Sequence, residues 1–119
     1  MKAVIFFAHG ARDIRWREPF DRLIDLWKSQ QPQVLVRLAF LEMMEPSLIA
    51  AIADLKIHEV DDITIVPVFF GQGGHLRNDY PVLLQECRSQ FPEINLKTTP
   101  AVGESDSVLQ AIIDFAVQA

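Results

Sequence analysis

The stretch Val66-Pro-Val-Phe-Phe-Gly-Gln-Gly-Gly-His75 begins as an apolar run and ends as a glycine-containing loop with a histidine at its tip. An earlier stretch, Ile5-Phe-Phe-Ala-His9-Gly10, repeats this arrangement. Nearly unbroken apolar runs are typical of strands that are covered on both faces, as in a parallel sheet. The two stretches therefore predict two strands of a parallel sheet, each ending in a chemically useful side chain.

Helical patterns separate these strands from two further apolar runs. The predicted strands cover residues 3–8, 34–41, 63–70 and 94–98. We expect Pro19 and Pro46 in the first turn of the first and second helices, where the missing N–H costs nothing. Asp79 is expected to cap the third helix, and Ser105 or Asp106 the fourth. The last helix is expected to turn four apolar residues toward the core, namely Val108, Leu109, Ile112 and Phe115.

The regular alternation of strands and helices predicts one α/β domain over residues 1–119. We expect a three-layer sandwich in which a four-stranded parallel sheet, with right-handed crossovers, carries helices on both faces. A strand order of 2-1-3-4 would make the first strand central. Cys87 falls on the buried stripe of the third helix and is interpreted as a small hydrophobic core residue.

Composition excludes several classes of function. The net charge of −5 argues against general nucleic-acid binding, which needs a basic surface. A single cysteine cannot form an internal disulfide, and no apolar run approaches the ~20 residues of a membrane span. We therefore expect a soluble cytoplasmic protein that binds neither nucleic acid nor membrane.

Polar residues follow three of the predicted strands. His9 follows the first strand, Glu42 the second, and His75 the glycine-rich segment after the third. In open α/β sheets, ligands bind outside the carboxyl ends of the strands, where the strand order reverses. The order 2-1-3-4 would bring these three side chains to one crevice. Two imidazoles and a carboxylate suit Co²⁺, Fe²⁺, Ni²⁺ or Zn²⁺.

Each of these residues also has an ordinary structural interpretation. A single histidine at a strand end is often a hydrogen-bonded loop residue, and Glu42 could be a charge near the start of the second helix. The glycines could simply turn the chain, and they do not form a Walker loop. His58 is favourable at a helix C-terminus without any function. The cluster Arg12, Arg15 and Arg17 is either a solvated face or an attraction for an anionic ligand.

Three segments resemble the small, single-module sirohydrochlorin cobaltochelatases, members of the class II chelatases. The first is Ala8-His9-Gly10-Ala11-Arg12, near the family's His-Gly-Ser-Arg. The second is Pro67-Val-Phe-Phe-Gly-Gln-Gly-Gly-His75-Leu-Arg-Asn-Asp79-Tyr-Pro81, near the family's Pro-x-Phe-Leu-x-x-Gly-x-His-x-x-x-Asp-x-Pro. Phe40-Leu41-Glu42, followed by Pro46, fits a middle motif. Ala11 departs from the serine that is common at its position.

The resemblance implies ATP-independent insertion of a divalent metal, with Co²⁺ as the first expectation and Fe²⁺ or Ni²⁺ as alternatives, into sirohydrochlorin or a related anionic tetrapyrrole. The metal is then a substrate, and no tightly bound cofactor is expected. His9 and His75 match the family's metal-handling histidines, and Glu42 matches an acidic residue that assists them. Longer relatives have two similar halves around the site, so the resemblance implies that this chain is one half and acts as a homodimer.

Substrate contacts are expected from the residues around this crevice. Arg12 and Arg77 could pair with peripheral carboxylates. Phe40, Phe69 and Phe70 could line the face of the macrocycle, although core packing is favoured for at least two of them. Glycines permit close approach of a large ligand, and the expected binding loop contains Gly71, Gln72, Gly73 and Gly74. Two alternatives are a non-catalytic metal or tetrapyrrole carrier and, less favoured because Ala8 replaces a required arginine, a histidine phosphatase.

Overall fold

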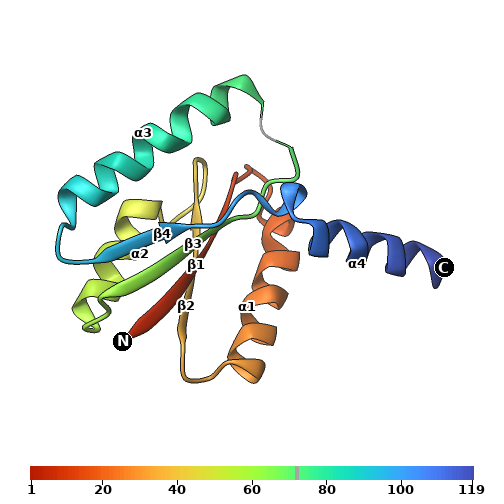
Figure 1. The fold of residues 1–119 in the computed structure, drawn as a ribbon, viewed down its shortest axis with the longest axis horizontal. Coiled ribbons are helices and arrows are strands. Elements are labelled where there is room, and N and C mark those ends of the chain that lie inside the picture. The colour runs from red at the N-terminus through yellow and green to blue at the C-terminus, as the bar shows by residue number, and fades with distance from the viewer. Residues whose placement is uncertain (72) are drawn as a thin grey trace.

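The computed structural model describes residues 1–71 and 73–119, with the backbone alone for Gly74 and His75. Its centre is a four-stranded parallel sheet in the order β2-β1-β3-β4, as predicted. The strands are β1 (Lys2–Ala8), β2 (Leu35–Phe40), β3 (Asp62–Pro67) and β4 (Asn95–Thr98). The expected fold class is confirmed, and β1 lies between β2 and β3 (Figure 1).

Four helices accompany the sheet. They are α1 (Glu18–Gln30), α2 (Leu48–Ile57), α3 (Gly74–Gln90) and α4 (Asp106–Val117). Short 3-10 turns at Ile14–Arg17 and Val102–Glu104 precede α1 and α4. Among the residues that the structure describes, no helix has both the length and the apolar character to cross a lipid bilayer.

The main core lies between the sheet and the helices α2 and α3. Ile5 and Phe7 of β1 and Ile65 of β3 are fully buried there. The Phe7 ring stacks on Tyr80 of α3 with 5.7 Å between centroids. Cys87 is also fully buried, as predicted, and burial raises the pKa of its thiol to about 11.

A smaller core lies on the opposite face, where α1 covers β1 and β2. Phe6 meets Trp27 edge to face at 5.7 Å, and the Trp27 indole N–H donates to the Val34 carbonyl at 3.0 Å. The apolar stripe of α1 packs against this face as predicted, and contains Phe20, Leu23, Ile24 and Trp27.

Two predicted helix starts are wrong. Pro46 lies outside α2, because Ser47 is the N-cap and its hydroxyl accepts from the Ala50 N–H at 3.2 Å. Asp79 lies inside α3, which begins at Gly74 after an extended Gly73 cap whose carbonyl accepts from the Arg77 N–H at 3.0 Å. The third strand is also shorter than expected, since β3 ends at Pro67 and the proline therefore does not interrupt it.

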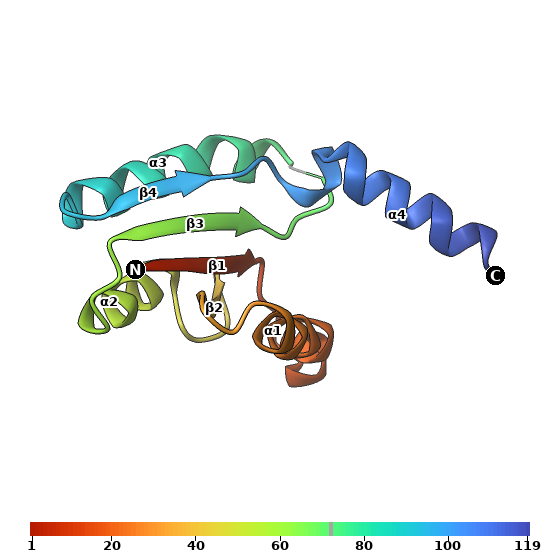
Figure 2. The ribbon, with the colours of Figure 1, turned by 60° about the horizontal axis from the view of Figure 1, so that its bottom comes forward.

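The last helix differs most from its prediction. Ser105 is its N-cap, as expected, but none of its residues is buried. The apolar residues expected in the core remain exposed; Phe115, for example, is 77% exposed. Both ribbon views show α4 running away from the sheet beyond the ends of the strands (Figures 1 and 2). Within the described part of the chain, no helix covers the face of β3 and β4 on the α1 side.

Candidate metal site at the carboxyl edge of the sheet

Gly10 joins the loops that follow β1 and β2. Its φ of +96° is a conformation that side chains rarely adopt, and a Cβ at this position would lie 1.8 Å from the Glu42 carbonyl oxygen. The Glu42 N–H donates to the His9 carbonyl at 3.1 Å. Glycine is therefore required after His9, since only its bare backbone allows the two loops to meet this closely.

The segment that carries Glu42 is held at both ends. The Leu41 N–H donates to the Ala8 carbonyl, and the Phe40 N–H donates to the Pro46 carbonyl, each at 2.9 Å. These bonds fold residues 41–46 back onto the end of β2. As predicted from neighbouring strand ends, His9 and Glu42 lie together at the carboxyl edge of the sheet.

The orientation of the His9 ring decides which nitrogen is free. Its Nδ1 lies 3.2 Å from the Gly10 carbonyl, and a carbonyl can only accept, so this bond places the proton of the neutral ring on Nδ1. The lone pair is then on Nε2, which lies 3.7 Å from the Glu42 carboxylate oxygen Oε1. Two acceptors facing each other are favourable only when a cation, either a proton or a metal ion, lies between them.

The 3.7 Å separation between these atoms suits a shared metal ion. Two ligands about 2.1 Å from one ion at a tetrahedral angle are about 3.4 Å apart, and a slightly wider angle gives the observed distance. Both side chains are half exposed, at 51% and 50%, so the site is open to a large partner. Within the described part of the chain, no group of three or more histidine, cysteine or acidic side chains could hold an ion.

The third predicted ligand, His75, is the second residue of α3, and its side chain lies outside the described residues. Gln72 also lies outside the described residues, and Gly74 is described by its backbone alone. Of the remaining loop glycines, Gly71 and Gly73 are exposed, and a Cβ at either position would have no neighbour within 4 Å. These two positions therefore offer open backbone beside the site.

The three arginines after His9 have different partners. Arg15 pairs with Asp13 at 2.7 Å, and Arg17 pairs with Asp21 at 3.3 Å while lying over the Phe40 ring. Arg12 is exposed and, within the described residues, makes no ion pair. Arg77 in the first turn of α3 is also exposed, and it makes no ion pair with another described residue. Arg12 and Arg77 are thus two guanidinium groups, in the loop after β1 and in the first turn of α3, with no ion-pair partner among the described residues.

The prediction that Phe40 contacts a ligand is wrong, because its ring is 1% exposed and packs under Trp16 in the smaller core. Phe69 is also a core residue. Phe70, in contrast, is 63% exposed just after β3. The expectation that at least two of these three rings pack in the core is confirmed, and Phe70 is the ring that a ligand could reach.

Gly103 contacts the backbone next to this exposed ring, and the sequence analysis did not single it out. Its N–H donates to the Phe69 carbonyl at 3.1 Å, and a Cβ on it would lie 1.6 Å from the Phe70 carbonyl oxygen. No feature of the Val102-Gly103-Glu104 segment pairs it with a residue more than thirty positions earlier. The contact arises from the way the chain leaves β4.

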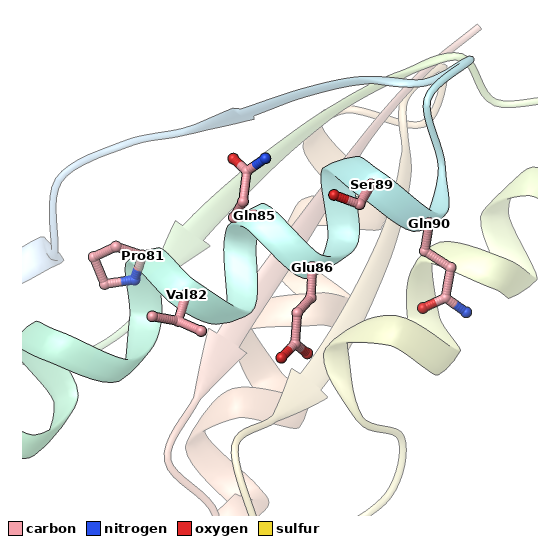
Figure 3. Close-up of a pocket in the computed structure, with 6 residues that line it drawn as sticks. All are labelled: Pro81, Val82, Gln85, Glu86, Ser89 and Gln90. Atoms are coloured by element: carbon pink, nitrogen blue, oxygen red, sulfur yellow. The ribbon is translucent and has the colours of Figure 1, made fainter.

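One surface hollow lies away from these residues, on the outer face of α3 (Figure 3). It is shallow, measures about 750 Å³, and is lined by Pro81, Val82, Gln85, Glu86, Ser89 and Gln90. It contains neither of the described candidate ligands, His9 and Glu42. The candidate site is therefore indicated by the polar groups that meet at the strand ends and not by this hollow.

Comparison with known proteins agrees with this fold. The model of the CbiX family matches residues 3–119, and the chain belongs to that family. It is 25% identical to a sirohydrochlorin cobaltochelatase from Priestia megaterium over 94% of its own length, but spans only 36% of that protein. It is also 25% identical to a protein of the same description from Saccharolobus solfataricus, covering 95% of this chain and 91% of the relative.

A solved structure shares the whole arrangement. A putative cobalamin biosynthesis CbiX protein from Marinobacter aquaeolei superposes with a TM-score of 0.82 at 27% identity. The alignment covers 99% of this chain and 93% of that one, so it extends into α4. The similarity thus includes the α4 segment as well as the sheet.

Proposed function

We propose that this protein inserts a divalent metal ion, Co²⁺ in the first instance, into sirohydrochlorin or a related anionic tetrapyrrole without ATP. The observation that carries the proposal is the His9–Glu42 pair, whose facing acceptor atoms lie 3.7 Å apart at the carboxyl edge of the sheet. Relatives described as sirohydrochlorin cobaltochelatases, at comparable and greater lengths, support the choice of reaction. Fe²⁺ and Ni²⁺ remain alternative substrates, because imidazole and carboxylate ligands accept all three ions.

The proposed mechanism starts with the metal between His9 Nε2 and the Glu42 carboxylate. His75 is proposed as the second imidazole. Neutral histidine and one carboxylate hold a divalent ion loosely enough to pass it on. Each insertion releases two pyrrole protons, which imidazole can accept on Nε2 once the ion has left that nitrogen. The charge of the ion also favours loss of those protons.

The substrate is proposed to lie against the open side of this pair. Arg12 and Arg77 would hold its peripheral carboxylates by charge-assisted hydrogen bonds. The exposed Phe70 ring would contact the macrocycle, while Gly71 and Gly73 allow a flat molecule to approach the backbone. Gln72 and Gly74 complete the proposed binding loop.

Three further features belong to the same proposal. The enzyme is proposed to act as a homodimer, since the described site is open on one side and some relatives are more than twice as long. It is proposed to carry no tightly bound cofactor, the metal being a substrate. A cytoplasmic location is proposed because the reaction belongs to biosynthesis of a soluble cofactor.

The test is an absorbance assay with purified protein, sirohydrochlorin and a panel of Co²⁺, Fe²⁺ and Ni²⁺. Chelation changes the spectrum of the macrocycle, so product can be counted per protein chain. The proposal predicts many turnovers with at least one of these ions, at a rate above that without protein. Product that stops at one equivalent per chain would instead identify a carrier and contradict catalysis.

A further inference from the structure

The chain that leaves β4 lies against the chain that leaves β3 (Figures 1 and 2). The Thr99 N–H donates to the Ile65 carbonyl at 3.0 Å, and the Gly103 N–H donates to the Phe69 carbonyl at 3.1 Å. Donor and acceptor both advance by four residues from the first bond to the second, so the register of β3 and β4 is kept after both strands have ended. The 3-10 turn Val102–Glu104 is therefore fixed against the segment that follows β3.

This contact requires glycine at position 103. A Cβ on Gly103 would lie 1.6 Å from the Phe70 carbonyl oxygen, 2.4 Å from the carbonyl carbon and 2.7 Å from Cα. All three are backbone atoms, so rotation of a side chain cannot relieve the clash. Gly103 has no left-handed φ, and the turn is closed by a bond from the Glu104 N–H to the Ala101 carbonyl at 2.9 Å. The turn alone would accept another residue, so the need for glycine comes from the position of Phe70.

The backbone of Phe70 is held from two sides. On one side, the Val68 N–H donates to the Phe7 carbonyl of β1 at 2.7 Å, and the Phe69 ring meets the Phe7 ring edge to face at 5.7 Å. On the other side lies Gly103. The Phe70 ring between these contacts is 63% exposed. An exposed ring on a fixed backbone can contact a flat ligand with little loss of conformational entropy.

The residues proposed to bind the metal are held by other contacts. The Glu42 N–H donates to the His9 carbonyl at 3.1 Å, between the ends of β1 and β2. His75 belongs to α3, which Leu76 anchors in the main core. A disturbance at Gly103 should therefore reach the Phe70 ring and leave the affinity for the ion nearly unchanged.

We propose that Gly103 is a positioning residue of the site: by acting through the backbone of Phe70, it holds the exposed ring where the ring contacts the face of the tetrapyrrole. This role rests on the proposed function, because it needs a flat substrate at the carboxyl edge of the sheet. Gly103 itself touches neither the substrate nor the metal. Its effect therefore belongs to binding of the macrocycle and disappears when the ring is absent.

The first test is a fluorescence titration of the full-length protein with sirohydrochlorin in the absence of metal. Phe70→Ala should weaken binding by about 10-fold, because an aromatic contact is lost. Gly103→Ala should weaken binding by about as much, because the added methyl group pushes the turn and the Phe70 backbone apart. In the double variant, the loss should stay within about twofold of that in Phe70→Ala alone.

Two outcomes of this titration would overturn the proposal. One is wild-type affinity in Gly103→Ala. The other is a loss of about 100-fold in the double variant, because Gly103 would then act without Phe70. Glu104→Ala, a change at an exposed position of the same turn, is the control and should bind within about twofold of wild type. Calorimetric titration of the folded variants with Co²⁺ should give affinities within about threefold of wild type; a larger loss in Gly103→Ala alone would contradict a role limited to the macrocycle.

A second test needs no variant and covers the case in which Gly103→Ala does not fold. A contact that favours binding of the substrate must itself be stabilised by the bound substrate. Amide hydrogen exchange at Gly103, followed by NMR in the wild type, should therefore slow by about fivefold or more with sirohydrochlorin bound. The Asn95 N–H, which donates to the Asp61 carbonyl at 2.9 Å at the other edge of the sheet, is the control and should change by less than about twofold.

The two tests also separate this role from the proposed reaction. A wild type that binds no sirohydrochlorin would contradict the proposed function, and the role of Gly103 with it. A wild type that binds sirohydrochlorin with unchanged exchange at Gly103 would overturn the role of Gly103 alone.

Discussion

The two edges of the sheet each carry a histidine beside an acid, and the pairs look alike at first. His9 lies near Glu42 at the carboxyl edge, with 3.7 Å between the nearest atoms, and its side chain is 51% exposed. His58 lies near Asp54 beyond the other edge, with a corresponding distance of 3.9 Å and an exposure of 52%. Neither distance nor exposure separates a metal site from an ordinary surface pair.

The difference lies in which ring nitrogen faces the acid. His58 turns Nδ1 toward both the Asp54 carbonyl, at 2.9 Å, and the Asp54 carboxylate, so the acid faces the N–H of the neutral ring. His9 uses Nδ1 on the Gly10 carbonyl and turns its lone pair on Nε2 toward Glu42. Asp54 also accepts from Arg37 at 2.6 Å. Only the His9 pair is arranged to take up a cation.

The largest expected effect tests this difference directly. His9→Ala should lower kcat/KM for metal insertion by at least ~100-fold, because it removes a metal ligand and a proton acceptor together. His58→Ala should remain within about twofold of wild type in the same absorbance assay. Equal losses in the two variants would show that the orientation of the ring does not matter.

The backbone that brings the two loops together gives the next effect. Gly10→Ala should lower the free energy of unfolding by about 2–4 kcal/mol, since it combines a positive φ with a clash against the Glu42 carbonyl. Gly71→Ala, which meets nothing within 4 Å, serves as the control and should change it by less than about 0.5 kcal/mol. Urea unfolding measures the free energy of unfolding of both variants. A Gly10→Ala protein as stable as the wild type would contradict the proposed role of this contact.

The acid of the His9 pair should have a smaller effect than the histidine. Glu42→Gln keeps the size of the side chain but removes its charge, and should weaken Co²⁺ binding by about 10- to 100-fold in calorimetric titration. Asp54→Asn makes the same change beside His58 and should leave Co²⁺ affinity unaltered. Unchanged affinity in Glu42→Gln would exclude the carboxylate as a ligand.

The smallest effect concerns stability at the His58 pair. The hydrogen bond from Arg37 lowers the pKa of Asp54 below its ordinary value of 3.8. This carboxylate therefore stabilises the fold above pH ~4, and its contribution is lost as pH falls through the lowered pKa. Because Asp54 is about half exposed, the contribution is at most about 1 kcal/mol. The difference in unfolding free energy between wild type and Asp54→Asn should shrink from pH 7 to pH 3; a constant difference would contradict this assignment.

Much of the fold was predictable because it depends on local pattern. Apolar runs and helical stripes indicated the four strands and the buried position of Cys87, and the order 2-1-3-4 that was expected for such a sheet is the observed one. The meeting of His9 and Glu42 followed from the rule that carboxyl ends of neighbouring parallel strands share an edge. Helix starts were less certain, since Pro46 and Asp79 carry signals typical of a first turn but lie outside α2 and inside α3.

Other features depend on contacts between distant segments. The need for glycine at position 10 arises from the Glu42 carbonyl, and the exposure of Phe70 arises with the Gly103 contact. The periodicity of α4 correctly marks an apolar face, but periodicity cannot tell whether that face packs on its own sheet or on another chain. Phe40 was predicted among the rings that could line a macrocycle, although the alternation of the strand turns its ring into the smaller core.

Anomalous diffraction from crystals soaked in Co²⁺, recorded at the cobalt absorption edge, would locate the ion itself. We expect a cobalt peak at the carboxyl edge, about 2.0–2.2 Å from both His9 Nε2 and a Glu42 carboxylate oxygen. A peak at the His58–Asp54 pair with none at His9 would contradict it.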